Sequence, residues 1–209
     1  MSGIHDLPLF LISSLLLNIT PGADTLYIVA RSAAQGSRAG MVATLGTAMG
    51  CNVHIFGAAL GLSALLAASA TAFTAVKLIG GAYLVYMGIS LCRDTSKLPA
   101  DTLAVEPVSL PRIFGQGFLT DVLNPKVALF FLAFLPQFIE PSAPDKALAF
   151  VMLGLIFNVS GTIWCFFLAW TTAYLGGRMA LGRRLAAWLS RAAGGIFVAL
   201  GIKLVVDPA

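Results

Sequence analysis

The sequence has few charged residues. Only 11% of its 209 residues are Asp, Glu, Lys or Arg, whereas 58% are hydrophobic. A soluble globular domain has roughly 25% charged residues, so this chain has too few to cover a surface in contact with water. Long apolar runs also recur along its whole length. The composition excludes an ordinary soluble protein and predicts an all-α integral membrane protein in a lipid bilayer.

Residues that bind metals or form disulfides are also scarce. The three cysteines, Cys51, Cys92 and Cys165, are far apart and form no CxxC motif, which favours a packing role. The two histidines, His5 and His54, do not have the spacing of metal ligands. The chain also lacks the GxxxxGK[ST] phosphate-binding loop. We therefore expect no metal site, no cofactor and no ATP hydrolysis within this chain.

Six segments are apolar and long enough to cross a bilayer, which takes about 20 helical residues. They are residues 7–32, 40–66, 72–92, 113–137, 147–175 and 186–206. The polar stretch between the third and fourth segments divides the chain into three parts. These are a first three-helix repeat (1–92), a cytoplasmic linker (93–111) and a second three-helix repeat (112–209).

The basic residues indicate the orientation. If the N-terminus is outside, the inner segments hold Arg31, Arg38, Arg93, Lys97, Arg112, Arg178, Arg183, Arg184 and Arg191. The outer segments then hold only Lys77, Lys146 and Lys203. Because cytoplasmic loops collect Lys and Arg, both termini are predicted to be periplasmic. The same tendency explains the net charge of +4 without a nucleic-acid partner.

The two halves share features of an inverted repeat. The run GAYLVYMGISL (81–91) in the third segment matches GGIFVALGIKL (194–204) in the sixth, with glycines at equal spacing. The first and fourth segments each carry a proline near the middle, Pro21 and Pro125. Because each half has an odd number of spans, the second half must be inverted. Interrupted spans at corresponding positions of inverted halves indicate a transporter binding site.

The two interruptions have the residues that start a new helix. In NITPGAD (18–24), Thr20 is suited to an N-cap and Pro21 to the first helical position. In the fourth span, Asn124 and Pro125 are suited to the same roles. We expect both spans to be broken at mid-membrane. The free N–H groups of each new half-helix would then attract an anion such as a carboxylate.

Three charged residues lie near these breaks: Asp24, Asp121 and Lys126. A charge at the centre of a membrane helix costs roughly 2.5–3.5 kcal/mol, so we expect these groups to pair with one another or to face water. A structural ion pair without a transport role is the alternative. Arg31 is expected to snorkel to the cytoplasmic surface. Further polar residues that could line a path are Asn52, His54 and Asn158.

Two long motifs carry a resemblance to a known family. NITPGADTLYIVARSAAQGSRAG (18–40) resembles the first-span signature of the LysE/RhtB amino-acid exporters, and GFLTDVLNPKVALFFLAFLPQF (117–138) resembles their fourth-span signature. The resemblance extends over essentially the whole chain, although Ala23 stands where the family commonly has a second proline. It implies export of amino acids or close derivatives across the bacterial inner membrane, driven by protons. It carries the family's motif residues over onto Asn18, Thr20, Pro21, Gly22, Asp24, Arg31, Asp121, Asn124, Pro125 and Lys126.

These observations lead to a mechanistic hypothesis. The substrate carboxylate would bind at the half-helix starts, near 20–22 and 124–126, and its ammonium would pair with Asp24 or Asp121. Burial favours a neutral carboxyl group, so a proton can replace the ammonium and couple the two fluxes. The alternatives are a channel, an intramembrane hydrolase with the two acids as a dyad, and a purely structural protein. Small-residue faces also allow a homodimer.

Overall fold

The computed structural model describes residues 3–64, 70–93, 106–140, 142–174 and 183–206. These residues form a bundle of helices, and apart from an isolated bridge between Ile4 and Ile139 they contain no strand. The linker predicted for 93–111 and the basic loop before the last span lie largely outside the described residues. The all-helical architecture agrees with the prediction from composition.

The first half of the chain begins with α1 (Leu7–Ile19), α2 (Ala23–Gly57) and the π-helix η1 (Ala58–Leu62). The sequence predicted separate helices before and after residues 33–39, and within this region the helical path of α2 is broken. Gly36 interrupts it with φ 82° and ψ 179°, a conformation reserved for glycine. A Cβ added to Gly40 would lie 3.0 Å from the Cβ of Ser32, although eight residues of straight helix span about 12 Å. The chain therefore turns back at Gly36 and forms a helical hairpin.

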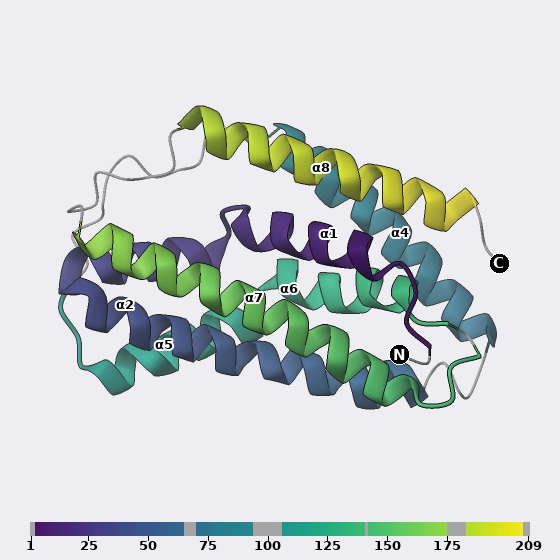
Figure 1. The fold of residues 1–209 in the computed structure, drawn as a ribbon, viewed down its shortest axis with the longest axis horizontal. Helices are drawn as coiled ribbons and strands as arrows, with labels where there is room; N and C mark the ends of the chain where they lie inside the picture. Colours follow the sequence, from purple (N-terminus) through teal and green to yellow (C-terminus); the bar gives the residue numbers. More distant parts are fainter. Residues whose placement is uncertain (1–2, 65–69, 94–105, 141, 175–182, 207–209) are drawn as a thin grey trace.

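The remaining helices are α4 (Ala70–Arg93), α5 (Leu110–Val122), α6 (Pro125–Leu129), α7 (Lys146–Tyr174) and α8 (Arg183–Val206). A π-helix, η2 (Phe130–Phe134), and a 3-10 helix, η3 (Leu135–Phe138), continue α6. In Figure 1, α1 lies between the α4 and α8 pair on one side and α2, α5 and α7 on the other. The start of α1 and the end of α8 lie at the same end of the bundle.

Glycines bring the helices of each pair close together. A Cβ on Gly50 in α2 would lie 2.7 Å from the carbonyl oxygen of Phe118 in α5. Between α4 and α8, a Cβ on Gly88 would lie 2.5 Å from Gly194 O, and one on Gly201 would lie 2.6 Å from Gly81 O. Only glycine permits backbones to approach this closely. These glycines are thus used for contacts within the chain.

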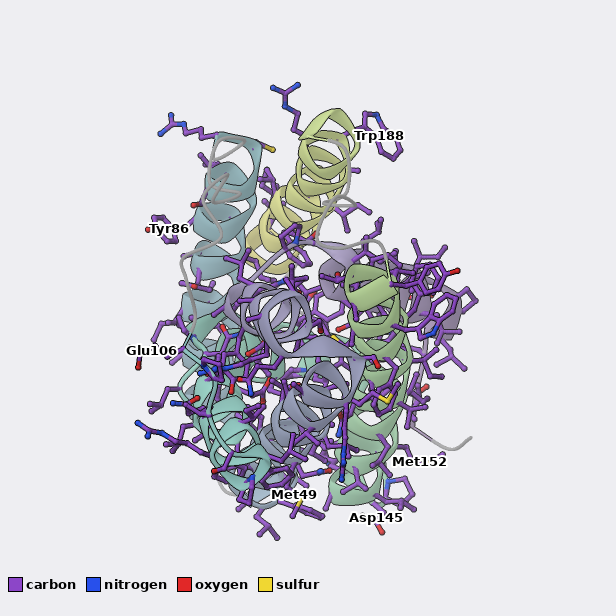
Figure 2. The ribbon with its side chains drawn as sticks, turned by 90° about the vertical axis from the view of Figure 1, so that its left-hand side faces the viewer. Met49, Tyr86, Glu106, Asp145, Met152 and Trp188 are labelled. Carbon is purple, nitrogen blue, oxygen red and sulfur yellow. The ribbon has the colours of Figure 1, made fainter. Side chains whose placement is uncertain are left out.

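Large apolar side chains lie on the outside of the bundle. They include Leu60, Ile79, Tyr86, Ile163, Trp188 and Val206, and Figure 2 shows Tyr86 and Trp188 pointing away from the neighbouring helices. Such a surface is suited to lipid rather than to water. The stretch Ala23–Leu62, which includes the turn at Gly36, and the helix Lys146–Tyr174 each contain an apolar window long enough to cross a membrane. The pair Leu110–Val122 and Pro125–Phe138, bent by 42°, could form a third crossing among the described residues.

Candidate functional site

The first break in the helices lies between α1 and α2. The Thr20 hydroxyl donates to the carbonyl oxygen of Leu16 at 2.7 Å, so Thr20 ends α1. Gly22 precedes the first residue of α2, and Pro21 lies outside both helices. The prediction that Thr20 and Pro21 start the second helix was therefore wrong. A threonine hydroxyl can donate to the carbonyl oxygen four residues earlier in its own helix, and Thr20 makes this bond instead of capping the next helix.

The second break follows the local rules of helix capping. Asn124 is the N-cap of α6, and its side-chain oxygen accepts a hydrogen bond from the backbone N–H of Lys126 at 3.0 Å. Pro125 occupies the first helical position, where its missing N–H costs nothing. The capping roles predicted for Asn124 and Pro125 are confirmed.

Side chains at the start of α6 form hydrogen bonds with the residues on both sides of the first break. The amide nitrogen of Asn124 donates to Asp24 Oδ2 at 2.6 Å. The Lys126 ammonium donates to the carbonyl oxygens of Leu17 and Thr20 at 2.9 and 2.8 Å. These carbonyls end α1, where a helix attracts positive charge. Two segments about a hundred residues apart in the sequence are therefore bonded into one unit.

The three charged groups were expected to pair with one another or to face water, and an ion pair of Lys126 with an acid is not observed among the described residues. Within the part of the chain that the structure describes, the ion pairs within 4.0 Å are His5 with Asp6 and His54 with Asp121. The ring of His54 also lies 3.0 Å from the backbone oxygen of Asp121. The ammonium of Lys126 is satisfied by backbone carbonyls instead, because the end of α1 comes within its reach.

The two acids, Asp24 and Asp121, line the same cavity. Each has one buried oxygen, Asp24 Oδ1 and Asp121 Oδ2, without a hydrogen-bond partner among the described residues. A buried polar atom without a partner is costly, so such atoms commonly mark a functional group. Here they mark two acceptors that a positively charged or hydroxyl-bearing ligand, or a proton, could satisfy.

A cavity of about 60 Å³ lies between α1, α2, α5, α6 and α7. Six of the predicted site or path residues line it: Asn18, Gly22, Asp24, Asp121, Lys126 and Asn158. Six others are not in its lining: Thr20, Pro21, Asn52, His54, Asn124 and Pro125. Among these six, Thr20 and Asn124 act by holding the charged groups in place. Asn52 is bonded to its own helix at Ala48 O.

The sequence analysis missed several residues of the lining. They are Leu17, Thr25, Thr47, Ala48, Cys51, Val127, Phe157, Gly161 and Cys165. On α7 the lining residues recur every three or four positions, which is the spacing of one helix face. The small and polar residues at this spacing were the available signal in the sequence. Cys51 and Cys165, interpreted as packing residues, are free thiols that contribute to the cavity wall.

Arg31 also departs from expectation. Its residue surface is only 7% exposed, so it does not snorkel to a surface. Its guanidinium is bonded to the side-chain oxygens of Gln35 and Gln116 and to the backbone oxygen of Glu106. The helix pair α2 and α5 and the chain leading into α5 enclose it.

An all-helical membrane protein with acids and a lysine around an internal cavity has the features of a membrane transport protein. A comparison with protein families matches residues 15–208 to the LysE type translocator family. The chain belongs to this family, as the two sequence motifs predicted.

Individual relatives agree with this assignment. An uncharacterized membrane protein of Pseudomonas aeruginosa is 32% identical over 206 residues, covering 97% of this chain and 95% of its own. A homoserine/homoserine lactone efflux protein of Salmonella typhi is 30% identical, with 93% of each chain covered. A leucine efflux protein of Salmonella choleraesuis is 28% identical, with 87% of each chain covered. No solved structure is significantly similar to the chain.

Proposed function

We propose that this chain is a secondary transporter that exports amino acids or close derivatives from the cytoplasm by proton antiport. The observation that carries the proposal is the cavity itself, where two acids and a lysine meet at two helix breaks in a LysE type translocator. The relatives named as efflux proteins for homoserine, its lactone and leucine give the substrate class. We place it in the inner membrane of a bacterial cell.

The proposed architecture is six spans in two inverted repeats, 1–92 and 112–209, joined by the linker 93–111. The contacts between α4 and α8 support it. The sequence repeat equates Gly81 with Gly194 and Gly88 with Gly201. The close contacts pair Gly88 with Gly194 and Gly201 with Gly81. Exchanging the repeats converts one contact into the other, as a two-fold axis between inverted halves requires.

In the proposed mechanism, the substrate ammonium binds at the unpartnered oxygens of Asp24 and Asp121. The carboxylate lies at the start of α2 near Gly22, within reach of the remaining N–H of Lys126. A proton and an ammonium compete for the same acids, so the site releases one when it accepts the other. Asn18 and Asn158 complete the wall around the substrate, while Thr20, Pro21, Asn124 and Pro125 shape the two breaks.

The site must widen during transport. A cavity of about 60 Å³ holds a few water molecules rather than an amino acid. Rocking of one repeat against the other would enlarge the cavity and open it to one side of the membrane at a time. A channel would need a continuous polar pore, whereas the charged groups here gather at one depth. A hydrolase could use the two neighbouring acids as a dyad, but membership of a translocator family favours transport.

The test is counterflow in proteoliposomes loaded with unlabelled amino acids, with and without a pH gradient. We expect labelled homoserine or leucine to exchange through the purified protein, and an imposed gradient to drive accumulation. Empty liposomes and liposomes with heat-inactivated protein are the controls. Folded protein that exchanges no amino acid would contradict the proposal, and recovery of a chemically altered solute would favour the hydrolase.

A further inference from the structure

A second polar site lies away from the cavity, around the buried Arg31. The guanidinium donates to Gln35 Oε1 at 3.1 Å, to Glu106 O at 3.0 Å and to Gln116 Oε1 at 2.9 Å. All three acceptors are neutral, and the Nε atom is buried without a partner. Among the residues described in 3–64, 70–93, 106–140, 142–174 and 183–206, no carboxylate lies within 4.0 Å of this charge.

The Glu106 carboxylate, the acid of the described segment next to Arg31, does not pair with the guanidinium. The residue is exposed, and Figure 2 shows its side chain on the flank of the bundle, pointing away from the helices. A guanidinium that is removed from water without an anion is destabilising, and a bidentate carboxylate is the partner that its planar fork fits best. The site therefore has the chemistry of a binding site for a carboxylate.

The same cluster fastens the chain that leads into α5. The side chain of Gln35 bonds Val108 twice, to its carbonyl oxygen at 2.9 Å and from its N–H at 3.2 Å. The Tyr27 hydroxyl donates to Ile113 O at 2.8 Å, and its ring lies 5.6 Å from the guanidinium carbon of Arg31. An anion that binds Arg31 in place of Glu106 O would release one of the bonds that hold this segment.

The position of the cluster relates it to the cavity. Arg31 follows Asp24 by seven residues on α2, about two turns or 10 Å along the same helix face. Gln116 precedes Asp121 on the facing helix α5. The cluster thus lies between the cavity and the end of the bundle that carries the Gly36 turn, opposite the start of α1. In the orientation predicted from the basic residues, this end faces the cytoplasm, from which an exporter receives its substrate.

We propose that Arg31, with Gln35 and Gln116, is an entrance site that binds the α-carboxylate of the substrate before it reaches Asp24 and Asp121. Binding replaces the neutral acceptors by a carboxylate and loosens the segment 106–108. This inference rests on the proposed export function. It adds a selection step, because a substrate without a free carboxylate gains nothing at this site.

The test compares two pairs of probes that differ in the free carboxylate: leucine with leucinamide, and homoserine with homoserine lactone. In proteoliposomes, R31Q should lower kcat/KM for the two acids by roughly ten- to a hundredfold, the range of a lost charge-assisted hydrogen bond. Its effect on the amide and the lactone should stay within about twofold. R38Q, which removes an exposed arginine beyond the same turn, is the matched control and should leave both pairs unchanged.

A second variant remains informative if R31Q folds poorly. Q116E places a carboxylate where the amide oxygen lies 2.9 Å from Arg31, at almost constant volume. The internal acid should compete with the substrate and reduce transport of leucine and homoserine, but not of leucinamide or the lactone. Equal losses for acids and amides in both variants would overturn the entrance site.

Binding is measured separately from transport, so that the two proposals can fail separately. In detergent, leucine should raise the thermal midpoint of the wild type more than that of R31Q, while leucinamide should act on both alike. Stabilisation with this pattern but no transport by the wild type would overturn the export function and support the carboxylate site. Transport by the wild type, with R31Q changing the transport of acids and amides to the same extent, would overturn the carboxylate site at Arg31 alone. The absence of both binding and transport would overturn both proposals.

Discussion

At the scale of single residues, the site depends on two side chains that each serve both helix breaks. Asn124 caps α6 with its oxygen and binds Asp24 with its nitrogen. Lys126 lies in the first turn of α6, where its N–H is bonded to the Asn124 cap, and its ammonium binds the carbonyl oxygens at the end of α1. The charge of Lys126 is thereby satisfied without an acid, so Asp24 and Asp121 keep an acceptor each for the transported species.

Replacing Lys126 tests this arrangement. K126M keeps the length of the side chain but leaves the carbonyls of Leu17 and Thr20 without a donor, at a cost of about 1–3 kcal/mol for each buried group. We expect a thermal midpoint in detergent several degrees below that of the wild type. K146M is the control, because Lys146 makes only a long bond to Ala143 O, at 3.3 Å. Equal midpoints for K126M and K146M would contradict the bridging role.

The sequence predicted those parts of the site that depend only on residues adjacent in the chain. Asn124 and Pro125 start a helix because capping depends on neighbours in the chain. The partners of Lys126 lie 106 and 109 residues away, and no local pattern shows that the end of α1 comes within its reach. The burial of Arg31 escaped prediction for the same reason, since Gln116 and Glu106 reach it only in the folded bundle.

At the scale of helices, the glycines of α4 and α8 set how closely the pair can approach. Their spacing was recognised in the sequence as a repeat, and in the structure it is a contact surface. A Cβ on Gly194 would lie 2.5 Å from Gly88 O, whereas one on the adjacent Gly195 would meet no other part of the described chain within 4 Å. Two neighbouring glycines on one helix thus have opposite environments.

These two positions give a prediction with an internal control. G194L should push α8 away from α4, and overpacking of this kind costs about 1–3 kcal/mol or more. G195L adds a side chain in open space and replaces a poor helix former, so it should leave stability unchanged or raise it. The thermal midpoints of both variants are measured in detergent, with size-exclusion chromatography to monitor unfolding and aggregation. A G195L protein as unstable as G194L would contradict the contact.

At the scale of the whole molecule, composition predicted the helical membrane fold because too few charges are present for a water-exposed surface. The boundary between the first two spans was predicted at residues 33–39, and the chain reverses within them, at Gly36. A homodimer stays a prediction. Gly46 and Gly50 pack against α5 within the chain, so they are not available to a second copy. Six spans, two inverted halves and an outward N-terminus belong to the proposal.

The most direct measurement is the pH-driven accumulation of labelled leucine or homoserine in proteoliposomes containing the wild type, D24N or D121N. If the two acids exchange a proton for the substrate ammonium, the wild type accumulates substrate when the gradient is imposed. Each variant then loses this response, because an amide cannot take up the proton. Accumulation by both D24N and D121N, at the rate of the wild type and with the same dependence on the gradient, would contradict proton antiport at this site.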